Sequence, residues 1–180
     1  MHIAMVSGSN RKDASSTKML RYMKRKLQEQ GYAVTLVDIY ETPLPMYAPD
    51  EDGVHPNAAR MIAAVREADG LVFATPEYHG SVSGALKNAL DYLSADEVRG
   101  KPVLSVSSAG GAVGVSSLTQ LQAIIRGLHG INSPEWVSIG GGHRFEGDAP
   151  ADEAMRKRVG RALDTFLKLT AALKAVTATC

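Results

Sequence analysis

Residues Thr75–Leu93 read TPEYHGSVSGALKNALDYL and join an apolar run to a helical pattern through a turn that begins with a proline. Residues 71–75 predict a buried strand, and apolar side chains recur at helical spacing within 81–93. Parallel α/β sheets bind their ligands outside the carboxyl ends of the strands, which makes the turn at 76–80 a candidate functional loop. A tight connection between strand and helix explains the same pattern equally well.

The alternation of strand and helix extends along the whole chain. Strands are predicted at residues 2–6, 33–39, 71–75, 101–107 and about 133–139. Helices are predicted at 16–30, 61–68, 81–93, 118–128 and 155–173. Five strands rich in Val, Ile and Leu favour a buried parallel sheet with helices on both faces. The commonest order for five such units is 2-1-3-4-5, so we expect loops 8–17 and 75–81 to meet at the ligand site.

Composition indicates one domain over residues 1–180 without a polyanionic partner. The chain holds 20 basic and 19 acidic residues, a formal net charge of +1, and 44% of its residues are hydrophobic. It lacks the basic stripe that is typical of nucleic-acid binders. Its apolar runs are shorter than the roughly 18 to 20 residues of a membrane-spanning helix, and MHIAMVSGS enters a strand without a secretion signal. We therefore expect a cytoplasmic protein that does not bind membranes.

Neither a disulfide nor a metal site is predicted. Cys180 is the sole cysteine, which excludes a disulfide within the chain. The histidines, at positions 2, 55, 79, 129 and 143, lack the paired spacing of metal ligands.

The loop after the first strand carries the residue types that bind phosphate. Residues 7–17 read SGSNRKDASST and run into a predicted helix, whose N-terminal amides and positive dipole end favour an anion. The hydroxyl groups add hydrogen-bond donors, and Arg11 is able to fork onto phosphate oxygens. Asp13 must then face away from the bound anion. Helix capping by Ser15 or Ser16 is the simpler alternative, but it accounts for only one hydroxyl.

The spacing in this loop excludes the P-loop and argues against the dinucleotide fingerprint. Only Gly8 is present, whereas the P-loop needs a second glycine followed by Lys and Ser or Thr. The dinucleotide fingerprint also needs further glycines, although Asp38 is placed like its ribose-binding acid.

Residues 107–114, here called the small-residue loop, follow the fourth strand and read SSAGGAVG. Small residues allow backbone N–H groups to approach the edge of a flat ligand and stabilise negative charge there. A flexible entry to the next helix would need only one or two glycines. Together with the phosphate loop and the turn at 76–80, this loop suits a mononucleotide with a planar ring, and FMN is the simplest candidate.

At this point the chain resembles the NADPH-dependent FMN reductases of flavodoxin-like fold, and most closely their azobenzene reductase and quinone reductase type. GSNRKDASST resembles the family's phosphate loop GSxRxxS, and PEYHGSVSGALKNALDYL resembles its PEYxxSxxGxLKNALD segment. SSAGGAVG and the following LQAIIRGL resemble its glycine loop and helix. The likeness extends from residue 3 to about residue 140.

The resemblance implies a flavodoxin-like three-layer α/β sandwich and assigns roles to the three loops. The FMN phosphate contacts are expected among Ser9, Arg11, Ser15, Ser16 and Thr17. One residue more than in the commonest spacing separates Arg11 from Ser15, which leaves the last three as alternatives. The isoalloxazine is expected to lie beside Pro76, Glu77, Tyr78 and His79, with its far edge along Ser108, Ala109, Gly110 and Gly111.

The implied activity is hydride transfer from NADPH or NADH to bound FMN and then to quinone, azo or flavin acceptors, by a ping-pong mechanism. No residue is a certain catalytic group, because FMN carries the chemistry. His79 is a candidate proton donor, against the alternative that it only shapes its turn. A flavodoxin-like electron carrier, or a flavin-binding protein without its own NAD(P)H turnover, is the rival interpretation. The near-neutral charge argues against a carrier, which usually has an acidic docking surface.

Three further features are left with two interpretations each. Met46 and Tyr47, in the proline-rich loop 42–56, either cap the acceptor pocket or belong to an ordinary surface loop. His143 and Arg144, in loop 140–150, either contact a pyridine-nucleotide phosphate or are solvated. Helix 81–93 either faces solvent or, as the resemblance implies, contributes to a homodimer or homotetramer with flavin sites near the interface.

Overall fold

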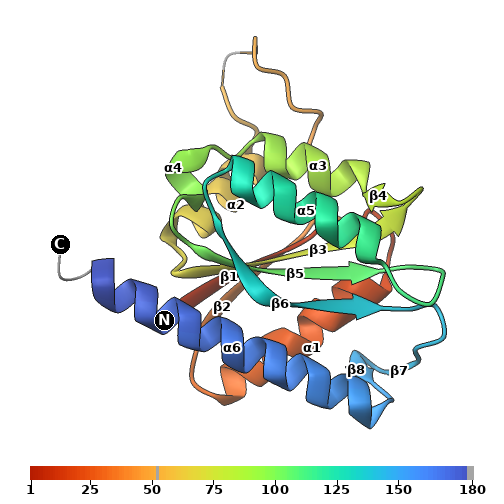
Figure 1. Ribbon diagram of the computed structural model, residues 1–180. Helices are drawn as coiled ribbons and strands as arrows, with labels where there is room; N and C mark the ends of the chain where they lie inside the picture. The colour runs from red at the N-terminus through yellow and green to blue at the C-terminus, as the bar shows by residue number, and fades with distance from the viewer. Residues whose placement is uncertain (52, 178–180) are drawn as a thin grey trace.

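The computed structural model describes residues 1–51 and 53–177, so Cys180 lies outside the described residues. Its main sheet is parallel and has the order β2-β1-β3-β5-β6 (Figure 1). The strands are β1 His2–Ser7, β2 Ala33–Asp38, β3 Gly70–Tyr78, β5 Pro102–Ser108 and β6 Ile131–Ile139. These correspond to the five predicted strands, and their order confirms the predicted 2-1-3-4-5.

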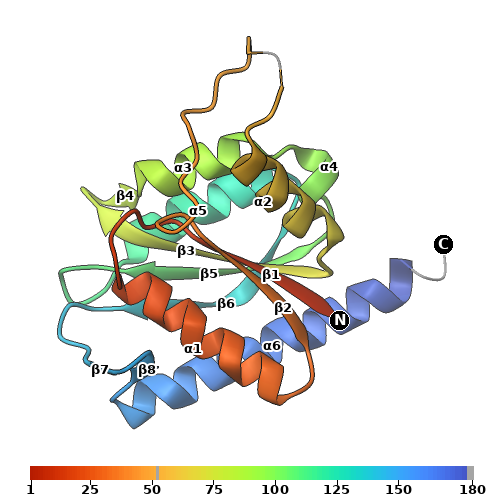
Figure 2. The same cartoon turned by 180° about the vertical axis from the view of Figure 1, so that it is seen from behind.

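Helices cover both faces of this sheet (Figures 1 and 2). One face carries α1 Ser15–Glu29 and α6 Glu153–Thr177, and the other carries α2 Pro56–Glu67, α3 Gly84–Asp91, α4 Ala95–Val98 and α5 Val115–Gly127. The sheet is buried on both sides because its side chains alternate between two apolar clusters. Met5 and Val72 pack with Phe166 of α6, whereas Val6 and Phe73 pack with Leu86 of α3. No helix within the described residues has both the length and the apolar content needed to span a bilayer.

The segment between β3 and α3 differs from the prediction of a helix over 81–93. Ser81–Val82 form a short strand, β4, which pairs antiparallel with the end of β3. The two residues that connect these strands, His79 and Gly80, have φ values of +53° and +73°, as in a tight hairpin turn. Helix α3 begins at Gly84, with the Ser83 side chain accepting a hydrogen bond from the Leu86 amide as its N-cap.

Three other short elements were not predicted. They are α4 and the antiparallel pair β7 Phe145–Glu146 and β8 Ala149–Pro150. Each has two to four residues, which is too short for periodicity to reveal. The expectation of five strands and five helices therefore becomes eight strands and six helices within residues 1–51 and 53–177.

Candidate functional site

The sheet register brings three strand ends to the same edge. Ser7 lies beside Ala74 of β3, and Pro76 lies beside Ser108 of β5. The Gly8 amide donates to the Ala74 carbonyl at 2.8 Å, so β1 and β3 end together. The phosphate loop, the turn at 76–80 and the small-residue loop consequently lie next to one another, as the predicted strand order requires.

A cavity of about 210 Å³ opens among these loops. Its lining residues are Arg11, Ala14, Ser15, Pro76, Glu77, Tyr78, Ser108, Ala109, Gly110 and Gly141. All of them except Ala14 and Gly141 were predicted from the sequence. Five other predicted residues, Ser9, Ser16, Thr17, His79 and Gly111, do not line the cavity.

The first turn of α1 offers an unfilled anion-binding end. Its N-cap is Ala14, which has no side chain to accept hydrogen bonds, and the first turn has no acidic residue. The sequence alternative that Ser15 or Ser16 caps the helix is thus wrong. Ser16 is fully buried, yet its Oγ has no hydrogen-bond partner among the described residues. Buried hydroxyls are normally paired, so Ser16 is unusual among the described residues, and the start of α1 beside it has no side-chain cap, which suits an anion at this helix end.

Ser9 and Thr17 stabilise the phosphate loop through hydrogen bonds within the protein. Ser9 is fully buried, and its Oγ accepts a hydrogen bond from the Arg11 amide at 3.2 Å. The Thr17 and Ser7 hydroxyl oxygens lie 2.6 Å apart, which ties the first turn of α1 to the end of β1. The exposed Arg11 guanidinium makes no ion pair with a described residue, which leaves its charge available to a ligand.

The turn at 76–80 is attached to α5. Glu77 Oε2 accepts a hydrogen bond from the Ser117 amide at 2.8 Å, in the first turn of that helix. Gln120 Nε2 donates to the Gly80 carbonyl at 3.0 Å, which fixes the tip of the hairpin. Tyr78 lines the cavity and is 42% exposed to solvent. His79 is exposed, and its left-handed backbone shows that it shapes the turn.

Glycines of two loops meet behind the cavity. A Cβ on Gly141 would lie 2.3 Å from the Gly110 carbonyl oxygen, and one on Gly140 would lie 2.1 Å from the Ala112 carbonyl oxygen. The Gly141 amide also donates to the Gly111 carbonyl at 2.8 Å. Protein packing therefore requires glycine at 140 and 141. At Gly110, by contrast, a Cβ would meet no protein atom within 4 Å, so packing does not explain the missing side chain there.

Met46, Tyr47, His143 and Arg144 do not line this cavity. Tyr47 is held against α3, with its amide donating to Asn88 Oδ1 at 2.8 Å and its ring in edge contact with Tyr92. Met46 is 79% exposed next to it. His143 Nδ1 lies 3.8 Å from Asp152 Oδ2, and Arg144 is exposed.

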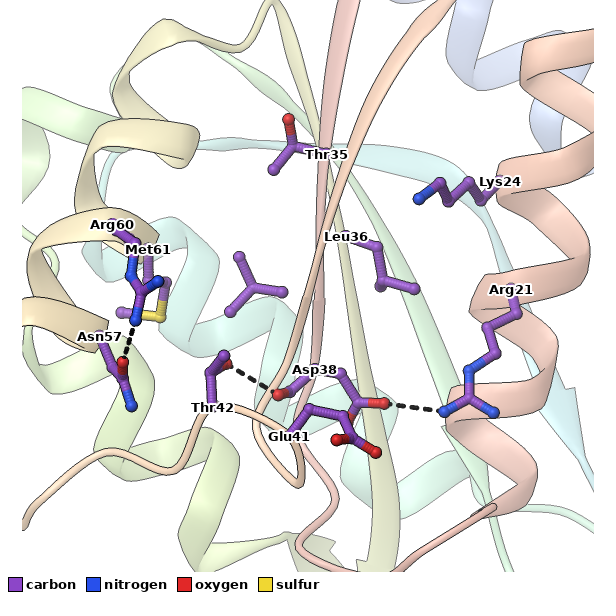
Figure 3. A pocket seen from close by; sticks show the side chains of 11 residues that line it. Arg21, Lys24, Thr35, Leu36, Asp38, Glu41, Thr42, Asn57, Arg60 and Met61 are labelled. Carbon is purple, nitrogen blue, oxygen red and sulfur yellow. Dashed lines mark hydrogen bonds and ion pairs between the residues drawn. The ribbon is translucent and has the colours of Figure 1, made fainter.

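A larger hollow of about 420 Å³ lies along the outer edge of β2 (Figure 3). It contains none of the predicted cofactor-binding residues, so we assign the site to the smaller cavity at the strand ends. Among the described residues, no group of three His, Cys, Asp or Glu side chains is arranged to hold a metal ion.

The strand-end cavity fits a flavin mononucleotide. The open first turn of α1, the unpaired Ser16 hydroxyl and the free Arg11 charge suit a phosphate. Ser108, Ala109 and Gly110 line the cavity with small side chains only, which suits the close approach of a flat ring.

Comparison with known proteins gives consistent results. Residues 1–144 match the family model described as NADPH-dependent FMN reductase. The chain is 32% identical over 154 residues to the NADPH azoreductase of Bacillus sp. strain OY1-2, covering 84% of each protein. It is 33% identical over 141 residues to the FMN-dependent NADPH-azoreductase of Staphylococcus saprophyticus, covering 74% of each.

Solved structures support the fold. The flavoenzyme FerB, an NAD(P)H:acceptor oxidoreductase from Paracoccus denitrificans, superposes with a TM-score of 0.79 at 20% identity, over 95% of this chain and 97% of that one. A flavodoxin from the domain Archaea gives a TM-score of 0.66 at 13% identity, over 94% and 99%. At these identities the likeness establishes the flavodoxin-like fold alone.

Proposed function

This chain belongs to the NADPH-dependent FMN reductase family, and we propose that it is an FMN-dependent NAD(P)H oxidoreductase whose cofactor binds in the strand-end cavity. The main support for this proposal is that the cavity is formed mainly by three loops that all belong to the part of the chain matched by the family model. Arg11, Glu77 and Gly110 come from three different loops, and all three loops lie within the matched residues 1–144. A single domain over residues 1–180 is part of the proposal.

When bound, FMN takes up hydride from a nicotinamide and passes reducing equivalents to an acceptor. The protein's part is to hold and orient the cofactor. Arg11, Ser15 and Ser16 bind the phosphate with the first amides of α1, while Ser9 and Thr17 keep that loop in shape. Pro76, Glu77 and Tyr78 border the ring on one side. Ser108, Ala109, Gly110 and Gly111 are proposed to lie along its far edge. The Ala109 amide already donates to the Ile139 carbonyl at 2.9 Å, so the backbone donor proposed for the negative charge of the ring is the Gly110 amide.

No side chain is assigned as catalytic. His79 stays a candidate proton donor, although its exposed position in the hairpin turn is explained by backbone geometry alone. Ping-pong kinetics, in which NAD(P)H and the acceptor would react in turn, are part of the proposal. Quinones, azo compounds and free flavins are the proposed acceptors. A homodimer or homotetramer, and a cytoplasmic location, also stay predictions.

The absorption spectrum of the purified protein is the first test. We expect a yellow protein whose released chromophore is FMN, and lack of any flavin affinity would overturn the cofactor assignment. Steady-state turnover with NADPH and a quinone or azo dye then tests the enzyme. Parallel double-reciprocal lines are expected for a ping-pong mechanism. A flavin-loaded protein that does not oxidise NADPH would instead be a flavodoxin-like carrier.

A further inference from the structure

Arg21 joins acidic residues from three separate parts of the chain. Its Nη1 lies 3.1 Å from Asp13 Oδ1 in the phosphate loop, and its Nη2 lies 3.1 Å from Asp38 Oδ2 at the end of β2 (Figure 3). Asp148, in the turn between β7 and β8, is 3.9 Å from Nη1. Arg21 therefore connects the phosphate loop to its neighbouring strand and to the loop that contains Gly141.

Asp13 is an unfavourable residue for an anion-binding loop. It lies between Arg11 and Ser15, which both line the cavity. Its side chain is 53% exposed, and its φ of +53° places it in the left-handed region that Asp and Asn tolerate better than other residues. A carboxylate here repels a phosphate at the start of α1 unless its charge is neutralised or directed elsewhere.

Asp38 fixes the position from which Arg21 acts. The Asp38 side chain is only 10% exposed, and its Oδ1 accepts a hydrogen bond from the Tyr40 amide at 3.1 Å. With one nitrogen bound to this buried carboxylate, the guanidinium presents the other to Asp13. Arg21 is also six positions after Ser15, so its ion pair draws the Asp13 carboxylate along the flank of α1 rather than toward the first turn.

We propose that Arg21 is a positioning residue for the cofactor phosphate, because it neutralises Asp13 and holds that carboxylate away from the anion-binding end of α1. The inference rests on the proposed binding of FMN in the strand-end cavity. It assigns Arg21 a role in selecting phosphorylated flavin, since riboflavin has no phosphate for Asp13 to repel.

The test is equilibrium titration of FMN and of riboflavin into apoprotein prepared from the holoenzyme. Arg21→Gln keeps a hydrogen-bond donor for Asp38 but removes the charge. In water, Coulomb repulsion between a dianion and a carboxylate separated by on the order of 8 Å corresponds to about a fivefold loss of affinity. We therefore expect Arg21→Gln to weaken FMN binding about fivefold, with less than about a twofold change for riboflavin and a smaller FMN effect at high salt.

Two further variants make the test specific. Asp13→Asn suits the left-handed backbone equally well and removes the charge, so Arg21→Gln with Asp13→Asn should regain the wild-type FMN affinity. Asp13→Asn alone should bind FMN at least as tightly as wild type. Arg25→Gln is the matched control, because Arg25 lies one turn further along α1 and pairs with Asp148, at 2.7 Å, but not with Asp13. It should leave FMN affinity unchanged.

Equal losses of FMN and riboflavin affinity in Arg21→Gln would overturn the inference, since they would indicate a structural role only. Failure of Asp13→Asn to restore FMN binding would overturn it as well. If Arg21→Gln does not fold, the Asp13→Asn variant alone decides the question. Weaker FMN binding by this variant than by wild type would overturn the inference. Wild-type protein that binds neither flavin would refute the cofactor assignment instead, which keeps the two failures distinct.

Discussion

Gly8 and Leu86 are in direct contact where the phosphate loop meets α3, and a Cβ on Gly8 would lie 2.3 Å from the Leu86 Cβ. Ser83 strengthens this junction. Its hydroxyl donates a hydrogen bond to the Gly8 carbonyl and accepts one from the Leu86 amide at 3.0 Å. The residue that opens the phosphate loop is thus fixed to the helix that follows the turn at 76–80.

Gly8→Ala should therefore destabilise the protein and weaken flavin binding together. The new methyl group must displace Leu86 or the Ala74 carbonyl oxygen, and overpacking of this kind costs about 1 to 3 kcal/mol. Urea unfolding of the apoprotein and FMN titration measure the two effects. Gly84→Ala is the control, since a Cβ there meets nothing within 4 Å in the first turn of α3 and should not destabilise. Equal stability of the Gly8→Ala variant and wild type would show that Gly8 and Leu86 are not tightly packed against each other.

Ser16→Ala separates ligand binding from folding. The Ser16 hydroxyl is buried without a partner, so its removal should leave apoprotein stability unchanged or slightly higher. If the hydroxyl binds the cofactor phosphate, FMN affinity should fall by about 0.5 to 1.5 kcal/mol.

Ser105→Ala is the matched control for Ser16. Ser105 is another buried serine whose hydroxyl has no partner among the described residues, but it lies within β5 and outside the cavity. It should retain normal FMN affinity. Equal FMN binding by both variants would exclude a phosphate contact for Ser16.

Arg11→Ala should weaken FMN retention by about 1.5 to 3 kcal/mol, the range for a hydrogen bond to a charged group. Arg11 lines the cavity and has no acidic partner among the described residues, so its loss should not disturb the fold. Fluorescence titration of apoprotein measures the affinity. Lys12→Ala removes the same charge from a neighbour outside the cavity and should have a smaller effect. Comparable losses of FMN affinity in both variants would show that Arg11 acts only through its positive charge and not through a direct contact with the phosphate.

The sequence predicts the sheet and its three strand-end loops because hydrophobic runs and glycine-rich turns are local signals. Val82 shows where local signals fail, since it fits the apolar spacing of the helix but lies in β4. Cross-strand pairing with Glu77 decides its structure, and periodicity does not detect that pairing. Gly141 was missed as a site residue for a similar reason. Its need for glycine arises from contact with Gly110, which is distant in the sequence.

Glu97 should make stability depend on pH in the acidic range. Burial opposes its ionisation, but hydrogen bonds from Arg66 at 2.6 Å and from the Ser94 amide and hydroxyl outweigh this and keep the pKa of Glu97 below its usual value. A lowered pKa contributes stability above the unfolded-state value, about 4.3, and loses it as the pH falls through the folded-state value.

Glu97→Gln tests this dependence. It should cost about 1.5 kcal/mol at pH 7, the lower end for a charged hydrogen bond because Arg66 is mostly exposed. The difference from wild type should shrink as the pH falls below about 4. Thermal unfolding at pH 7 and pH 3.5 measures both values. A difference that is constant over this range would show that the ionised form of Glu97 has no special stabilisation.

Gly110→Val tests whether the small-residue loop borders the flavin ring. A Cβ at Gly110 would meet no protein atom within 4 Å, and the residue has no positive φ, so the folded apoprotein should accept valine. Because Gly110 lines the cavity, a valine that occupies the space of the ring edge should overpack the bound cofactor by about 1 to 3 kcal/mol, an affinity loss of about five- to 150-fold. FMN content after purification and titration of the apoprotein measure this loss. Gly142→Val is the control, because that glycine is equally unobstructed but lies outside the cavity. Because the apoprotein fold is expected to survive in both variants, normal flavin loading by Gly110→Val would place the edge of the ring elsewhere.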